Sequence, residues 1–282
     1  MNNLSNDTDR QSIAVPVFIY VALPCEAKPL VKYFKLKKDE IYQGFPLYKK
    51  DNIHLVISGL GKTAMAAAIG FSQALMGSSR NSILINVGIA GHRTHSIGDK
   101  FCIDKITDDD TNKDYYPQLV AKLPCPTNSL TTLSSAKTDY PEMCLYDMEA
   151  SAFYQTALRF TTSELIQCLK VISDNESSTI KNINPLQTSE LISDCLKDLD
   201  TLVLKLAKLA SLSHYFDDRI YQELLEKWHF TASNRIKLKF LLNQWQVLTN
   251  HAPLTETINS GDNGKTFLKT LARQIELCEY QL

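Results

Sequence analysis

Apolar runs of strand length alternate with helical patterns over the first 210 residues, and this alternation most constrains the fold. Residues 13–23, 82–87 and 165–173 are rich in β-branched residues and nearly free of charge. Such runs are typical of strands covered on both faces of a sheet. Helical patterns lie between them, for example at 27–34 and 63–76. The alternation predicts an α/β fold, a three-layer αβα domain around a central, mostly parallel, mixed sheet.

The strand pattern stops near residue 210, after a long helix predicted at 185–210. Beyond it the sequence shows only helical patterns, at 216–228, 234–248 and 265–280. We therefore expect a disordered N-terminal tail, an α/β domain and a helical C-terminal extension, over residues 1–12, 13–210 and 211–282 respectively.

Charge and cysteine usage exclude several classes of protein. With 30 Lys and Arg against 31 Asp and Glu, the net charge of −1 offers no general surface for nucleic acid or membrane. No apolar run approaches 18 residues, and because the start is polar we expect no signal peptide. The seven cysteines form no CxxC pair, which indicates free thiols in a reducing compartment. We expect a cytoplasmic protein.

The basic residues of the extension lie near Trp228 and Trp245, as in a nucleic-acid-binding helical unit. Acidic residues and apolar stripes among them favour packing instead, on the main domain or across a dimer. We therefore do not expect nucleic acid to be a partner of this protein.

Motifs for nucleotide triphosphates and metals are incomplete. The turn at residues 59–63 lacks the first glycine of a triphosphate-binding loop, because Val56 stands in its place. His92 and His95 have no companion at a recognisable ligand spacing. The sequence predicts no metal and no organic cofactor.

Three carboxylates are candidates for catalysis. Glu26 and Asp174 come directly after predicted strands, and Glu149 lies in the first turn of a helix predicted at 148–159. Each has a local explanation, since acids are favoured in first helical turns and in turns. However, strand ends on one edge of a parallel sheet meet in one crevice. Acids gathered there must be paired or partly neutral, which indicates proton-transfer chemistry.

Gly88 and Gly91 follow the predicted strand at 82–87, where glycine allows a positive φ or a close approach of a ligand. Residues 107–128 are polar and predict an irregular loop, and long loops in compact domains are often functional.

The ordered set of these motifs resembles the nucleoside phosphorylase and nucleosidase superfamily. The resemblance is nearest to its hydrolytic branch, which acts on methylthioadenosine, adenosylhomocysteine or futalosine, and it spans about residues 13–210. The matching segments are Val21-Ala22-Leu23-Pro24-Cys25-Glu26-Ala27, Ser58-Gly59-Leu60-Gly61-Lys62, Ile85-Asn86-Val87-Gly88-Ile89-Ala90-Gly91, Ile97-Gly98-Asp99, Asp147-Met148-Glu149-Ala150 and Ile172-Ser173-Asp174.

The resemblance implies a catalytic role for Asp174, as the acid that protonates the purine at N7. It implies that Glu26 is the base that deprotonates the attacking water. Glu149 would bind the ribose hydroxyls, and Met148 would pack on the apolar face of the sugar. Carboxylates nearby would stabilise the oxocarbenium-like charge of the transition state.

The resemblance implies further substrate contacts for Gly88, Ile89 and Ser173, which belong to the same motifs. His92 stands where the family often has Gly, close to the predicted sugar site, and is a candidate for an additional contact.

Water is the predicted nucleophile. Phosphorylases of the superfamily usually carry Arg on the early loop, and Arg and Ser around the second Gly-rich loop. This chain has Glu26, Ile85 and Ile89 there, and a carboxylate would repel phosphate. The resemblance thus implies a homodimeric nucleosidase that cleaves the N-glycosidic bond of a purine-type nucleoside.

The segment between Gly98 and Asp147 is shorter than in typical nucleosidases, and the loop that surrounds the purine has no clear counterpart. Tyr115, Tyr116 or Tyr140 would supply a stacking surface or serve as loop anchors. A non-catalytic nucleoside-binding protein therefore stays open as an alternative.

The other alternative is a phosphorylase. It would bind phosphate through His92, Arg93 or Lys62.

Overall fold

The structure is a computed structural model, and it describes residues 13–41, 44–76, 81–120, 122–136, 140–178, 184–212, 218–249, 254 and 263–279. The tail predicted at residues 1–12 lies outside these ranges. Contacts divide the chain into two compact units, Met1–Ser211 (unit 1) and Leu212–Leu282 (unit 2).

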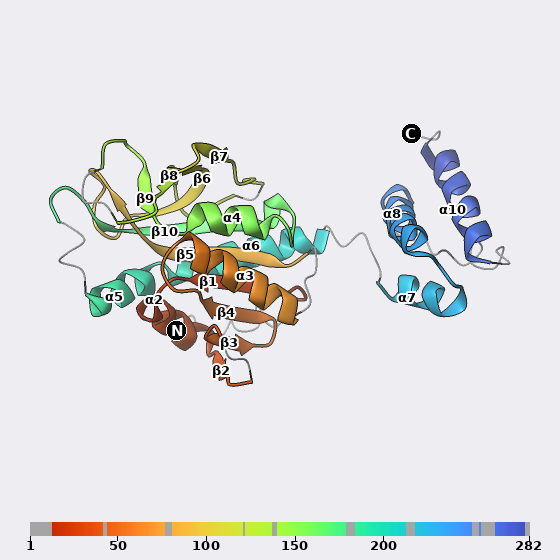
Figure 1. The fold of residues 1–282 in the computed structure, drawn as a ribbon, viewed down its shortest axis with the longest axis horizontal. Coiled ribbons are helices and arrows are strands. Elements are labelled where there is room, and N and C mark those ends of the chain that lie inside the picture. Colours follow the sequence, from red (N-terminus) through yellow and green to blue (C-terminus); the bar gives the residue numbers. More distant parts are fainter. Residues whose placement is uncertain are drawn as a thin grey trace. The chain divides into compact units, whose positions relative to one another are not determined.

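Unit 1 contains one mixed sheet with helices on both faces (Figure 1). Its strands are β1 (Val17–Val21), β2 (Lys37–Asp39), β3 (Leu47–Lys50), β4 (Ile53–Ile57), β5 (Ile83–His92), β6 (Lys100–Asp108), β7 (Lys113–Tyr115), β8 (Thr127–Thr132), β9 (Leu145–Asp147) and β10 (Ile166–Asp174). Its helices are α2 (Pro24–Phe34), α3 (Lys62–Met76), α4 (Ala150–Ala157), α5 (Pro185–Asp194), α6 (Leu196–Leu212) and the 3₁₀ turn η1 (Ser163–Leu165).

Alternation along the central strands builds the layers. On β1, the side chains of Val17, Ile19 and Val21 pack with α2, α5 and α6, whereas Phe18 and Tyr20 pack with α3 and α4. All five side chains are at most 1% exposed. Burying each one stabilises the fold by roughly 1.5–3 kcal/mol. Figure 1 shows α3 and α4 in front of the sheet and α6 behind it, so the predicted αβα fold is confirmed.

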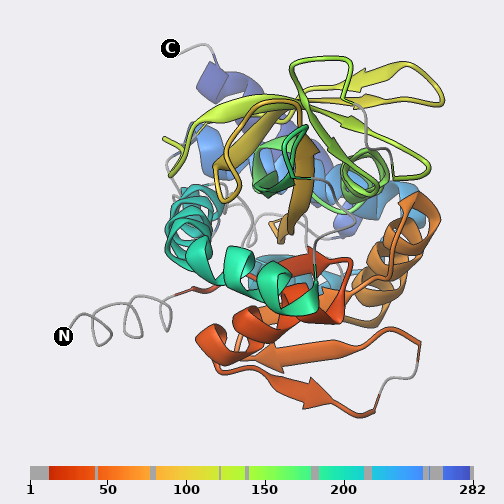
Figure 2. The ribbon, with the colours of Figure 1, turned by 90° about the vertical axis from the view of Figure 1, so that its left-hand side faces the viewer.

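Five strands of the sheet close into a ring. β5 pairs with β10, β10 with β6, β6 with β8, β8 with β9, and β9 returns to β5. Figure 2 views unit 1 from the side that carries α5, and the yellow and green strands β6, β8 and β9 curve over the top of the view. The ring brings three distant segments together, because Gly91 of β5 pairs with both Tyr146 of β9 and Asp174 of β10.

The structure corrects three details of the prediction. β5 continues to His92, so Gly88 and Gly91 lie inside a strand, and neither is among the glycines with positive φ. The segment predicted as a loop at 107–128 contains β7, which is too short and polar to show a strand period. The single helix predicted at 185–210 is two helices, separated at Cys195, whose N–H donates to the carbonyl of Ile192.

Unit 2 has its own hydrophobic core. Its described helices are α7 (Asp218–Lys227), α8 (Ala232–Leu248) and α10 (Gly264–Glu279). The Thr231 hydroxyl caps α8 by accepting from the N–H of Asn234. Leu238, Phe267 and Leu271 are fully buried in the core. Two basic residues of the predicted extension lie on aromatic rings within the unit, Lys227 on Trp228 and Lys239 on Tyr221.

All seven cysteines are unpaired thiols, as predicted, four of them buried and three partly exposed. In the described ranges, no helix combines the length and the apolar character needed to cross a membrane.

Candidate active site

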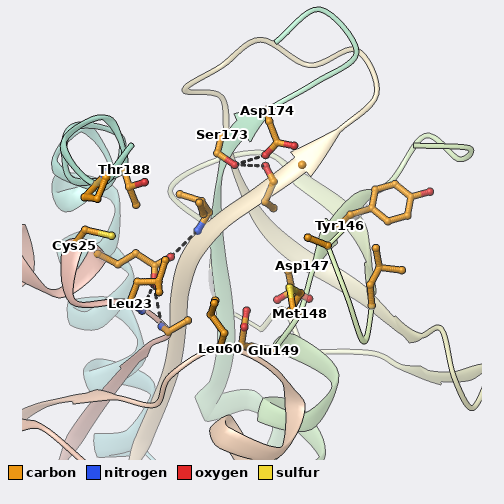
Figure 3. Close-up of a pocket in the computed structure, with 18 of the residues that line it drawn as sticks. Leu23, Cys25, Leu60, Tyr146, Asp147, Met148, Glu149, Ser173, Asp174 and Thr188 are labelled. Atoms are coloured by element: carbon orange, nitrogen blue, oxygen red, sulfur yellow. Dashed lines mark hydrogen bonds between the residues drawn. The ribbon is translucent and has the colours of Figure 1, made fainter. Parts of the chain in front are cut away.

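A cavity of about 320 Å³ lies where the ends of β1, β5 and β10 meet the start of α4, a size typical of small-molecule sites. Figure 3 shows Ser173 and Asp174 at the top of the view, Leu60 and Glu149 at the bottom, and Cys25 and Thr188 on the left. The lining residues are Ala22, Leu23, Cys25, Glu26, Leu60, Ile89, Ala90, Gly91, Leu133, Ala136, Tyr140, Tyr146, Asp147, Met148, Glu149, Ser173, Asp174, Asn184, Pro185 and Thr188.

The cavity therefore brings together the three candidate carboxylates and three of the predicted contacts, Met148, Ile89 and Ser173. Gly88 and His92 are not among the residues that line it.

Glu26 is held in place by backbone amides. It lies in the first turn of α2 and is 2% exposed. Its Oε2 accepts from the N–H groups of Ala22 and Leu23 at 2.9 and 2.8 Å, and its Oε1 accepts from the N–H of Ile89 at 3.1 Å. Burial raises the pKa of Glu26, and the amides and the charge of Lys170 partly offset this effect. The three hydrogen bonds fix the direction of the carboxylate.

Glu149 precedes α4 as its N-cap residue, so it does not lie in the first helical turn as predicted. Asp147 explains the difference, because its Oδ2 accepts the N–H of Ala150 and leaves the Glu149 side chain free to reach the cavity. Glu149 Oε1 accepts from the N–H of Gly61 at 2.7 Å. Burial and the neighbouring Asp147 raise the pKa of Glu149 to about 7.

A buried ion pair lies behind these acids. Lys170 Nζ of β10 lies 2.8 Å from Asp147 Oδ2 of β9, and both side chains are 1% exposed. The other oxygen of Asp147, Oδ1, accepts a hydrogen bond from the Thr132 hydroxyl at 2.8 Å. Sequence reasoning missed Lys170. A lysine within an apolar, central strand was the available signal, because a buried charge requires a partner.

Asp174 is 1% exposed and bonded on both oxygens. The Ser173 hydroxyl donates to Oδ1 at 2.6 Å, and the Tyr140 hydroxyl donates to Oδ2. Both donors line the cavity. Tyr140 was one of three tyrosines considered from the sequence, and the structure brings this one to the acid.

The glycines of β5 allow close approach, but by the protein's own side chains. A Cβ at Gly88 would lie 3.1 Å from Glu26 Oε1 and 3.4 Å from Lys170 Nζ. A Cβ at Gly91 would lie 2.8 Å from Cε1 of Tyr140. A side chain at either position would therefore require these neighbours to shift.

His92 is fully buried at the end of β5. Its Nδ1 accepts from the N–H groups of Thr94 and His95 at 3.0 and 2.9 Å. Because Nδ1 acts as an acceptor, the imidazole is neutral in this arrangement. Its candidate contact with substrate stays a prediction.

The other cations considered as phosphate ligands have acidic partners. Lys62 Nζ lies 3.0 Å from Asp108 and 2.5 Å from Asp110, and Arg93 Nε lies 2.9 Å from Glu176. Neither Lys62 nor Arg93 lines the cavity. No group of three or more metal-binding side chains is found among the residues that the structure describes.

Comparison by sequence gives no match, either to a protein-family model or to a curated protein. Comparison with solved structures does give matches. The 5'-methylthioadenosine/S-adenosylhomocysteine nucleosidase of Colwellia psychrerythraea, in complex with adenine, is 18% identical and covers 69% of this chain and 95% of its own, with a TM-score of 0.53. The Streptococcus pneumoniae nucleosidase, with a transition-state inhibitor, is 18% identical and covers 69% of this chain and all of its own, with a TM-score of 0.54.

The futalosine hydrolase of Helicobacter pylori is 13% identical, covers 68% of this chain and 98% of its own, and has a TM-score of 0.54. These matches confirm the resemblance predicted from the sequence at the level of the fold. The chain shares the fold of these nucleosidases and of this futalosine hydrolase.

Proposed function

We propose that this protein is a nucleosidase, which hydrolyses the N-glycosidic bond of a purine-type nucleoside resembling methylthioadenosine or adenosylhomocysteine. One observation carries the proposal. Glu26, Glu149 and Asp174, which are far apart in the sequence, line one sugar-sized cavity. The neighbours that share the fold are named as nucleosidases and as a futalosine hydrolase, which supports this class of reaction.

Asp174 donates a proton to N7 of the base, so that the base leaves as a neutral group. Glu26 orients a water molecule and removes its proton as the water attacks the anomeric carbon. Three hydrogen bonds from backbone N–H groups fix the direction of the Glu26 carboxylate before substrate binds. General acid and general base steps each contribute about 10²–10⁴-fold.

Glu149 binds the ribose hydroxyls, and Met148 packs against the sugar. The transition state carries positive charge on the sugar ring. Glu26, Asp147 and Glu149 surround that position with carboxylates that are each at most 7% exposed. Fixed negative groups in a desolvated site stabilise such a charge more strongly than water does.

Water rather than phosphate is the proposed nucleophile. Among the described residues that line the cavity, none is Lys or Arg. A phosphate dianion would enter a site of buried carboxylates, with Lys170 already paired to Asp147. Coulomb repulsion in a site of low dielectric opposes that entry.

Product analysis tests the proposal. The full chain is incubated with methylthioadenosine, adenosylhomocysteine, adenosine and inosine, with and without inorganic phosphate. We expect free base and free sugar at rates independent of phosphate. Ribose 1-phosphate as product would indicate phosphorolysis and contradict the proposed hydrolysis. Tight binding without turnover for every nucleoside would support a non-catalytic binding protein.

A further inference from the structure

Tyr140 lines the candidate active site beside Asp174. Its side chain is 4% exposed, and its hydroxyl donates to Asp174 Oδ2. The ring lies against the backbone of Gly91, where a Cβ would approach Cε1 to 2.8 Å. On another side it packs against Tyr146, with ring centroids 5.1 Å apart. The phenol thus contacts the carboxylate of Asp174, the backbone of Gly91 and the ring of Tyr146.

A leaving base would need to reach the same carboxylate. In the proposed reaction, Asp174 must reach a ring nitrogen of the base, so the base must lie at the carboxylate. The Tyr140 hydroxyl already occupies Oδ2 there, and Ser173 occupies Oδ1. Two planar groups do not fit in one position at van der Waals distance. The base and the Tyr140 ring therefore compete for Asp174.

We propose that Tyr140 occupies the base position in the ligand-free protein, and that its side chain rotates away when a base binds. This inference rests on the proposed function, since it identifies the competing ligand as a planar, purine-like base. Tyr140 then sets the affinity of the site for bases: a ligand must replace both the ring contact with Gly91 and the hydrogen bond to Asp174.

The size of the effect follows from the contact. A hydrogen bond to a charged group is strong enough to shift a two-state population by about 10- to 100-fold. If only the open fraction binds the base, the apparent Kd is raised by the reciprocal of that fraction. Removing the hydroxyl should therefore tighten base binding about 10-fold or more.

Calorimetric titration of the full chain with adenine at pH 7 tests the inference. The variants are Tyr140→Phe, which removes only the hydroxyl, and Tyr140→Ala, which also removes the ring. Tyr116→Phe is the matched control, because the exposed Tyr116 hydroxyl also donates to a carboxylate, Asp114 Oδ2 at 3.3 Å, away from the cavity. Thermal unfolding establishes that each variant is folded.

We expect Tyr140→Phe and Tyr140→Ala to bind adenine at least about 10-fold more tightly than the wild type, with Tyr116→Phe unchanged. Adenine should also increase nitration of Tyr140 by tetranitromethane in the wild type, because displacement exposes the phenol. Equal affinities in all four proteins would overturn the inference. Weaker binding by Tyr140→Ala would overturn it too, since Tyr140 would then be a stacking partner of the bound base.

The proposed function fails separately. Nucleoside hydrolysis by the wild type, measured alongside, decides whether the protein is a nucleosidase whatever Tyr140 does. If Tyr140→Ala binds no adenine while nucleosides are hydrolysed, the inference about Tyr140 is wrong and the proposed nucleosidase function holds.

Discussion

Lys170 Nζ lies 2.8 Å from Asp147 Oδ2, and neither side chain is more than 1% exposed. The pair joins β10 to β9 within the ring of strands, directly behind the acids of the cavity. Burial opposes the lysine charge, but the charges of Asp147 and Glu149 raise the pKa of Lys170 above its usual range. The ammonium therefore stays charged and offsets the repulsion among carboxylates that would otherwise face one another.

Replacing Lys170 should destabilise unit 1 strongly. Lys170→Met leaves Asp147 buried without its cation, and breaking a buried pair in this way costs about 3–5 kcal/mol. The free energy of unfolding, from urea titration of the full chain followed by circular dichroism, measures the loss. Lys170→Met with Asp147→Asn should recover part of it, since no unpaired charge remains.

A partly exposed pair supplies the control for that measurement. Lys100 Nζ lies 2.6 Å from Asp198 Oδ2, with side chains 31% and 24% exposed. Lys100→Met should cost no more than about 1 kcal/mol, because solvent screens the pair. Equal losses for the two lysines would contradict the role assigned to Lys170.

Glu26→Gln should lower the turnover of nucleoside by about 10²–10⁴-fold, because an amide removes no proton from water. It should also lower the free energy of unfolding by about 1–3 kcal/mol. Both oxygens of Glu26 accept from backbone N–H groups, so the NH₂ introduced by Glu26→Gln would place one donor against another. Steady-state hydrolysis and thermal unfolding measure the two effects. The exposed Glu190 gives the control Glu190→Gln, which should change neither. Near wild-type turnover by Glu26→Gln would remove Glu26 from the mechanism.

Asp174→Asn should reduce turnover as much but disturb the fold less. The Asn oxygen still accepts from Ser173, and the Tyr140 hydroxyl accepts from the new NH₂ by rotating. The expected loss is about 10²–10⁴-fold in kcat, with thermal unfolding close to the wild type. Asp194→Asn, on the exposed end of α5, is the matched control. A folded Asp174→Asn variant of undiminished kcat would refute the assigned acid.

Glu149 should make stability depend on pH. Its pKa is about 7 in the folded protein, against an ordinary value of 4.5, because burial and Asp147 disfavour the charge. The folded state thus holds this proton more tightly than the unfolded state. The resulting stabilisation is complete below about pH 4.5 and is lost as the pH rises through about 7.

The measurement compares urea unfolding of the wild type and Glu149→Gln between pH 4.5 and 8. Gln keeps the oxygen that accepts from Gly61 and does not titrate. The free energy of unfolding of the wild type should fall by about 3 kcal/mol relative to Glu149→Gln over this range, while groups common to both proteins cancel. A difference that does not change with pH would contradict the raised pKa.

The sequence by itself determined the layers of unit 1 and the acids of its candidate site. Alternation on β1 assigns Val17, Ile19 and Phe18 to their faces, because a side chain must leave a strand on one side or the other. The positions of Glu26 and Asp174 after strands indicated one crevice, because parallel strands end on one edge. These features are local, and a local pattern is enough to predict them.

Only the tertiary structure decided what surrounds those acids. Gly91 pairs with Tyr146 and Asp174 through ring closure, and this register depends on backbone partners more than 50 residues away in the chain. The Lys170 pair with Asp147 and the contact of Tyr140 with Asp174 follow from that closure. No period or spacing along the chain encodes such contacts, because they form only when segments distant in sequence are packed against one another.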